Sequence, residues 1–246
     1  MISLWLSDEL DSTGKVITEF ITEMPGKPRS SRFQDFGNLA TVKLHRVCNM
    51  CNNEWMSELE RQTSPILIPM IRGQSTELSP EQQHQISAWC QLKCLTLDAF
   101  YPRTYGGIQH LPPKTSHAFG QLYQPLLNST VTLSRFIPSK ANEKVRFGRY
   151  MSNLPADDVR ASLDVVIVTL ALGQLLLQVS IGASGDVPAR QAGYSLVTRP
   201  ALQCWPTFGA QHWPPVGVVV GDEFDNVAKA VVMVSQVTEF PGPPLH

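Results

Sequence analysis

The sequence has few charged residues and no excess of either sign. Charged residues make up 17% of the 246 residues, and the formal net charge is -1. This composition excludes a general electrostatic attraction to nucleic acid, which a strongly basic protein would have. A phosphate contact therefore requires a local basic group. Residues 25–32 (PGKPRSSR) form the candidate loop, with three basic residues and no acid, although a solvated loop is the simpler interpretation.

Secretion and membrane signals are also lacking. The first residues contain neither the basic region nor the long apolar run of a signal peptide. One apolar stretch, residues 165–181, is interrupted by Gly173 and Gln174 and is rich in β-branched residues. This pattern predicts two buried strands joined by a tight turn rather than a spanning helix. We therefore expect a cytoplasmic, soluble protein without a membrane partner.

Several catalytic signatures are missing. No serine lies in a Gly-x-Ser-x-Gly elbow, and residues 182–185 (GASG) are too short for a phosphate-binding loop. His110, His117 and His212 have no acidic partner close in sequence. These absences argue against a serine-hydrolase triad and against a nucleotide site, and no small-molecule cofactor is evident.

The five cysteines are an odd number and make a poor disulfide framework. They occur as Cys48 and Cys51, Cys90 and Cys94, and the single Cys204. This usage fits a reducing compartment in which thiols are free or bound to metal. Cys90 and Cys94, one helical turn apart, are either small core residues or additional ligands for the first pair. The core interpretation is the simpler one.

The remaining pattern predicts an α+β protein. A small cysteine-bearing module, residues 1–75, precedes a mixed helical and antiparallel-sheet domain, residues 76–246, with the boundary at the turn 73–76. Ser79 and Pro80 begin a long helix that is expected to stop before Pro102. The other predicted helices are 53–62, 66–71, 116–127 and 222–230, and the predicted strands are 41–47, 130–137, 163–172, 175–181, 194–198 and 216–220.

The strongest chemical signal is a C-x2-C turn between a strand and a helix. Residues 48–55 read CNMCNNEW. Two thiolates at this spacing supply half of a tetrahedral zinc site from one tight turn, and two further ligands must come from elsewhere. A strand, a knuckle and a helix in this order are what a ββα-metal site needs.

In this context residues 46–60 (RVCNMCNNEWMSELE) resemble the second half of a zinc-containing HNH endonuclease family that is common in bacteria. Members typically read R-x-C-x-x-C-N-N-G-W-M-S-x-L-E at this place. The similarity continues through residues 78–82 (LSPEQ) and 88–93 (AWCQLK), and more weakly through 170–173 (LALG) and 213–215 (WPP). The match at the knuckle is specific. The downstream match consists of short, scattered sequence segments and is weaker.

The resemblance implies roles for individual residues. Cys48 and Cys51 would hold half of a structural zinc site. Asn52 would occupy the metal-binding position at the helix start, and Asn38 would be the middle asparagine that fixes the loop. A divalent ion such as magnesium would polarise the scissile DNA phosphate and stabilise the leaving oxygen.

The first half of the family pattern has no counterpart. Relatives begin with another C-x2-C and an E-H or D-H pair, whose histidine activates water. Here residues 1–6 (MISLWL) resemble only the end of that segment. The chain is then a remnant that has lost cleavage, a chain from a mis-set start, or a protein in which another residue took over. His45 is the nearest substitute for the base, and an exposed strand histidine is its other interpretation.

Two functions therefore stay open. The first is an HNH-like nuclease with a truncated ββα-metal module, whose metal-dependent DNA hydrolysis we expect to be impaired. The second is a non-catalytic protein that binds nucleic acid or another protein through the same scaffold.

Overall fold

The computed structural model describes residues 4–10, 17–22, 30–35, 49–105, 111, 113–139, 145–155, 162–182, 201–207, 209–224 and 227. The helices are α1 (Leu4–Glu9), α2 (Asn49–Asn53), α3 (Trp55–Ile71), α4 (Pro80–Tyr105), α5 (Pro113–Leu122) and a short 3-10 turn (Gly221–Glu223). The strands are β1 (Ile17–Thr22), β2 (Ser30–Asp35), β3 (Thr76–Leu78), β4 (Ser129–Ile137), β5 (Val145–Pro155), β6 (Ser162–Leu172), β7 (Leu175–Gly182), β8 (Leu202–Trp205), β9 (Gln211–Trp213) and β10 (Val218–Val220).

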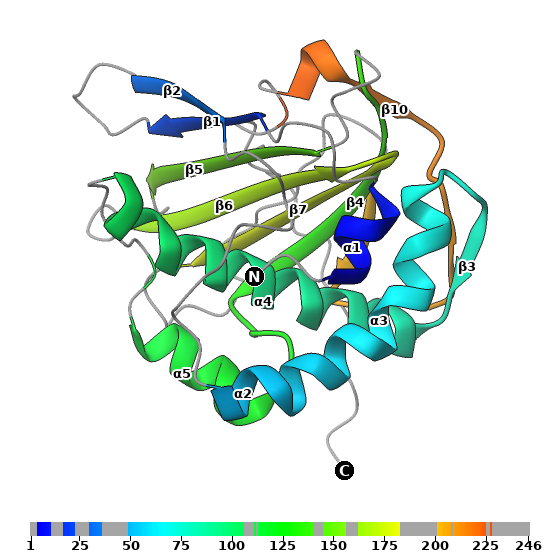
Figure 1. Cartoon of the computed structure of the whole chain (residues 1–246), viewed down its shortest axis with the longest axis horizontal. Coiled ribbons are helices and arrows are strands. Elements are labelled where there is room, and N and C mark those ends of the chain that lie inside the picture. Colours follow the sequence, from blue (N-terminus) through cyan, green and yellow to red (C-terminus); the bar gives the residue numbers. More distant parts are fainter. Residues whose placement is uncertain are drawn as a thin grey trace.

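The chain is an α+β protein, as predicted, built on a large and mainly antiparallel sheet. Its strand order is β10-β4-β7-β6-β5-β1-β2, with β8 also paired to β4. Two of the pairs are parallel, β1 with β5 and β10 with β4. Strands β3 and β9 form a separate two-stranded sheet. Helix α4 crosses the large sheet and α3 packs beside α4, so the fold has a helical layer on a sheet layer (Figure 1).

The hairpin predicted for residues 165–181 is confirmed at the centre of the sheet. Strands β6 and β7 pair antiparallel from Val165 opposite Gly182 to Leu172 opposite Leu175. Alternate residues of β7 face two clusters. Leu175, Leu177, Val179 and Ile181 join the main core, and Leu176 joins Phe136, Ala171 and Phe224 on the other side. Burial on both faces explains why the stretch is almost continuously apolar.

The predicted helix start at Ser79 is also confirmed. The Gln82 backbone N–H donates to Ser79 Oγ (3.2 Å), and the Ser79 backbone N–H donates to Gln82 Oε1 (2.9 Å). This reciprocal pair is a capping box. The helix runs on to Tyr105, beyond the predicted end before Pro102. A proline near a helix end removes one backbone bond without necessarily ending the helix.

Helix α3 corrects a second prediction. Prolines 65 and 69 lie inside it, although the sequence predicts a break between 62 and 66. Ile66, Leu67, Met70 and Ile71 are buried, so tertiary packing outweighs the bonds that the prolines remove. Ser64 Oγ lies 3.5 Å from the Arg61 carbonyl that Pro65 leaves without an amide donor.

Helix α5 begins and ends earlier than the predicted range 116–127. Pro113 occupies its first position, where a missing N–H costs little. The helix ends because Tyr123 adopts a left-handed conformation (φ 53°). The predicted strand at 216–220 is shortened to Val218–Val220, and the 3-10 turn lies where a late helix is predicted. The predicted strands 41–47 and 194–198 lie outside the described residues.

Residues from both sides of the predicted boundary near residue 75 meet in the main core. Leu67 and Met70 from α3 belong to the same buried cluster as Trp89 from α4 and Leu177 from β7. The division into 1–75 and 76–246 stays a prediction. In the described part of the chain, no helix is both long enough and apolar enough to cross a membrane.

The turn between β6 and β7 joins the sheet to the end of α3. Gly173 has a φ of +55°, and a Cβ placed there would lie 2.6 Å from the Ile71 carbonyl oxygen. The next residue, Gln174, donates its backbone N–H to that same oxygen (2.9 Å). We predict that Gly173→Ala lowers the free energy of unfolding by about 2 kcal/mol or more, because a side chain is strained there and strikes backbone.

Gly120→Ala is the matched control for this prediction in urea unfolding. Gly120 lies in α5 with open space around its Cβ position. Alanine should raise the free energy of unfolding there by about 0.5–1 kcal/mol, since it favours helix. Equal effects of the two substitutions would contradict the assigned role of the turn.

Candidate functional site

Two of the five predicted site residues lie in the described part of the chain, both in α2. Cys51 is half-buried and packs against the main core. Asn52 follows it, and its Nδ2 donates to Asn53 Oδ1 (3.2 Å) at the surface. Asn38, His45 and Cys48 lie outside the described residues. The roles that the resemblance gives to all five stay predictions.

The knuckle differs locally from the predicted turn. Residues 49–53 are already helical, whereas the sequence predicts a turn up to Cys51 and a helix from Asn53. Glu54 interrupts the helix with φ -100° and ψ -103°. Backbone bonds of 3.0 Å still run from Glu54 N to Met50 O and from Glu58 N to Glu54 O. Helix α2 therefore leads directly into α3, and its orientation depends on how α3 is held.

A row of three aromatic side chains lies beside α2. Phe119 from α5 is buried, Trp55 at the start of α3 is half-buried, and Tyr123 is 52% exposed. Trp55 lies 6.0 Å from Phe119 and 4.7 Å from Tyr123 between ring centroids, tilted by 56° and 35°. Offset, tilted pairs of this kind are favourable for aromatic rings. The row joins α3 to α5 and runs from the core to the surface.

Tyr123 holds this place at a conformational cost. Its backbone N–H donates to the Phe119 carbonyl (2.8 Å), as expected of the residue that ends a helix in the left-handed conformation. Glycine usually occupies this position, because any other residue loses about 1–2 kcal/mol there. Sequence reasoning missed Tyr123, since a positive φ at tyrosine has no sequence signature. The spacing of Phe119 and Tyr123 was the available hint.

A second group, the Glu60 cluster, consists of Trp5, Glu60, Trp89 and Lys93. Trp5 Nε1 donates to Glu60 Oε2 (2.7 Å), and Lys93 Nζ forms an ion pair with Glu60 Oε1. The same Nζ lies 5.2 Å from the Trp89 ring centroid, and the Trp5 and Trp89 rings are 6.1 Å apart. The Lys93 and Glu60 side chains are only 13% and 17% exposed. The cluster joins α1, α3 and α4.

The Glu60 cluster brings together three segments that carry the nuclease resemblance, around Trp5, Glu60 and Trp89. Sequence reasoning assigned no chemistry to these side chains. In the structure they satisfy one another, with both Glu60 oxygens engaged. Their arrangement supports a structural role for this part of the resemblance.

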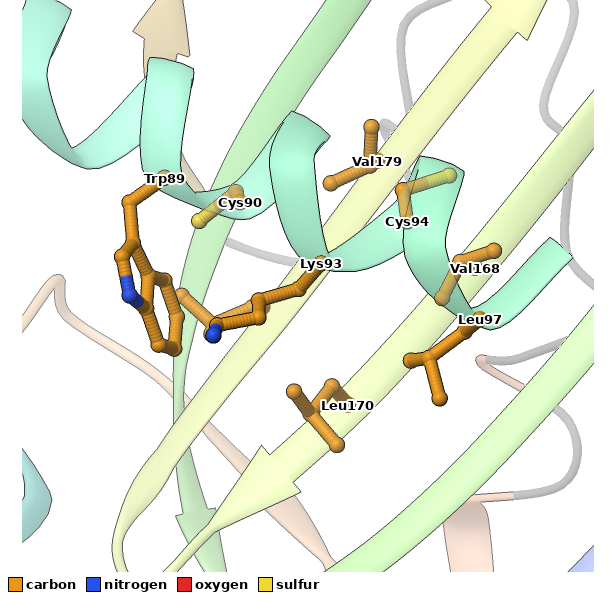
Figure 2. A pocket seen from close by; sticks show the side chains of 9 residues that line it. Trp89, Cys90, Lys93, Cys94, Leu97, Val168, Leu170 and Val179 are labelled. Atoms are coloured by element: carbon orange, nitrogen blue, oxygen red, sulfur yellow. The ribbon is translucent and has the colours of Figure 1, made fainter. Parts of the chain in front are cut away.

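A small cavity lies next to this cluster, between α4 and the sheet. Its volume is about 10 Å³, and it is lined by Trp89, Cys90, Lys93, Cys94 and Leu97 of α4 and by Val168, Leu170, Leu177 and Val179 (Figure 2). This is room for about one water molecule, so the cavity is too small for a substrate.

Cys90 and Cys94 are core residues, as the simpler interpretation predicts. Both are buried in the main cluster. Burial raises the pKa of the Cys90 thiol and that of the Cys204 thiol, so these two groups are neutral at physiological pH. Zinc binds thiolates, and this environment opposes their formation.

The described residues do not by themselves provide a complete metal site. Within the ranges that the structure describes, no three or more His, Cys, Asp or Glu side chains are grouped so as to hold an ion. Cys51, Cys90 and Cys94 are therefore not ligands of one ion. A zinc site at the knuckle needs Cys48 and further ligands beyond these ranges, so no reaction step is assigned to a metal ion.

The structure also pairs Ser75 with His212, two residues far apart in sequence. Ser75 Oγ lies 2.9 Å from His212 Nε2, and Glu77 is opposite His212 in the β3–β9 register. All three side chains are exposed. A hydroxyl and an imidazole in bulk water lack the enclosure that activates a nucleophile. We assign this pair to the stabilisation of the small sheet.

Comparison with known proteins gave no match: no protein-family model, no curated protein and no solved structure matches this chain. The HNH resemblance therefore rests on the residues quoted for it.

We predict that Glu60→Ala lowers the free energy of unfolding by about 2–3 kcal/mol, because it removes a mostly buried carboxylate that accepts from both Lys93 and Trp5. Glu58→Ala is the control on the same helix. Hydrogen bonds from Arg61 and then from Gln62 hold the pKa of Glu58 at about 2, but this group is exposed. Urea unfolding should show a clearly smaller loss for Glu58→Ala than for Glu60→Ala, because exposed ion pairs contribute little to stability.

Proposed function

We propose that this chain is an HNH-like nuclease that acts on DNA phosphodiester bonds with a divalent metal ion. The observation that carries the proposal is the position of Asn52. It lies directly after the second cysteine of the knuckle, on a short helix, with its amide at the surface. Asn52 is the residue that the resemblance assigns to the catalytic ion. Such an ion would supply charge stabilisation at the phosphate.

Cys51 and Asn52 are adjacent in α2 but have different surroundings, which supports a separate role for each. Cys51 packs against the core, whereas the Asn52 amide lies at the surface. Successive residues of a helix point about 100° apart, so adjacent positions serve different sides. Cys51, together with Cys48, would then serve the structural zinc ion, and Asn52 would serve the catalytic ion from the exposed surface of α2.

A second candidate function is nucleic-acid binding without cleavage. It is favoured by the exposed end of the aromatic row, where Tyr123 and Trp55 lie beside α2. Exposed aromatic rings bind bases by stacking and need neither a general base nor a metal ion. Cleavage and binding assays on the same variants separate the two functions.

For the first function we expect slow plasmid nicking that requires Mg²⁺ or Mn²⁺ and stops with a chelator. Asn52→Ala should reduce the nicking rate by about 100-fold, since it removes a proposed ligand of the ion that stabilises the transition state. Asn53→Ala is the control, because it removes the neighbouring exposed amide and the hydrogen bond between the two. Equal loss in both variants, or nicking that survives Asn52→Ala, would contradict the role of Asn52.

For the structural site we predict about one zinc ion per chain, lost in Cys48→Ser, because each thiolate is one of four ligands. Cys90→Ala should keep its zinc, since Cys90 is a buried core thiol. Elemental analysis of the purified proteins measures both. A zinc-free wild-type protein would show that the knuckle binds no metal and that the resemblance extends to its fold alone.

A further inference from the structure

The exposed end of the aromatic row is the feature left unexplained by folding alone. Tyr123 occupies a left-handed position where glycine is the favoured residue, and its ring is half exposed. Because about half of its surface is in water, Tyr123 contributes less to the core than a fully buried aromatic residue does. Tyr123 thus occupies a backbone conformation in which glycine would be less strained. Strain of this kind tends to occur where a side chain serves a binding function.

The row is continuous with the candidate nuclease site. Trp55, which supports the Tyr123 ring at 4.7 Å, begins α3 only three positions after Asn52. Helices α2 and α5 are both at the lower edge of the molecule in Figure 1, and Trp55, two residues after the end of α2, contacts Phe119 of α5. A base placed on Tyr123 would therefore bring the neighbouring backbone of its strand toward the surface of α2 that carries the Asn52 amide.

The side chains of α5 add positive charge and no negative charge to the helix that ends at Tyr123. Helix α5 carries Lys114 and His117, both exposed, and contains no acidic residue. The whole sequence between Asp98 and Glu143 contains no aspartate or glutamate. On the opposite side, Glu54 is exposed at the junction of α2 and α3, and Glu58 is engaged by Arg61. Glu54 is thus the acidic side chain that would repel a phosphate bound beside the row.

We propose that Tyr123, supported by Trp55, is a base-stacking platform for single-stranded nucleic acid, and that it guides the strand past Asn52. This inference rests on the proposed nucleic-acid function and adds the substrate class: unpaired bases rather than an intact duplex. Stacking requires a base whose face is accessible, which only a single strand or an opened duplex offers. A base of any kind has such a face, so the platform has little sequence preference.

Fluorescence anisotropy of the full chain with a labelled oligothymidine of about 12 nucleotides tests the platform. The titration contains a chelator, so cleavage does not enter the measurement. Tyr123→Gly is the decisive variant. Glycine suits the left-handed position, so the protein stays folded while the ring is lost. Binding should weaken by about ten-fold or more, and Tyr123→Trp should restore it.

Two further variants distinguish stacking from general apolar contact and probe the charge beside the strand. Leu127, four residues after Tyr123, is 79% exposed. Leu127→Ala should leave oligothymidine binding within about two-fold, because it removes apolar surface but no ring. Glu54→Gln should tighten binding, because it removes a negative charge beside the strand.

Defined results would overturn the platform. Wild-type affinity in a folded Tyr123→Gly, or no oligothymidine binding by the wild-type chain, excludes it. If Leu127→Ala and Tyr123→Gly weaken oligothymidine binding equally, the contact is generally apolar and is not stacking. If both variants instead abolish a concentration-dependent dimer, the surface is a protein contact. Failure of the nuclease proposal leaves a different signature. A chain that never nicks DNA, yet binds oligothymidine in a Tyr123-dependent way, keeps the platform and loses only catalysis.

Discussion

The position of α3 depends on hydrogen bonds between its last turn and the large sheet, and most of these bonds involve Gln174. This residue, in the turn between β6 and β7, donates its backbone N–H to the Ile71 carbonyl and accepts the Phe136 N–H. Its side chain accepts from Arg135 and lies 3.4 Å from the Arg72 carbonyl. One turn residue thus links the last turn of α3, strand β4 and the central hairpin. The Glu60 cluster holds the middle of α3 against α4, and Trp55 holds the first turn of α3 against α5, so both contacts fix the position of the short α2 before it.

The arrangement explains why α3 stays intact through Pro65 and Pro69. Each proline removes one backbone hydrogen bond, yet the helix is fixed at its end by Ile71 and in its middle by Glu60. Local signals were sufficient where the sequence determines structure over a few residues. The Ser79 capping box and the Gly173 turn were predictable for that reason. The two proline signals were misleading because long-range packing outweighed them.

Long-range pairing was not available from the sequence. Strand β1 pairs in parallel with β5, and β10 with β4, across large separations that no local pattern specifies. The candidate site shows the same limit. The motif predicted a helix after the cysteines and directed attention to Asn52, but nothing local indicated that Tyr123 would meet Trp55. The meeting requires a left-handed tyrosine and the packing of α5 against α3, both of which are tertiary outcomes.

The Glu60 cluster shows that several of the residues that resemble the nuclease family have a packing role. Trp5, Glu60 and Trp89 come from separate parts of the matching sequence, and in the structure Trp5 contacts both of the other two. A scaffold needs these contacts whether or not it cleaves DNA, because they hold α1, α3 and α4 together. Matching residues of this kind are therefore explained by folding alone and say little about catalysis. Any catalytic meaning of the resemblance is confined to Asn52, whose amide lies at the surface of α2 and is not required for the packing of α3.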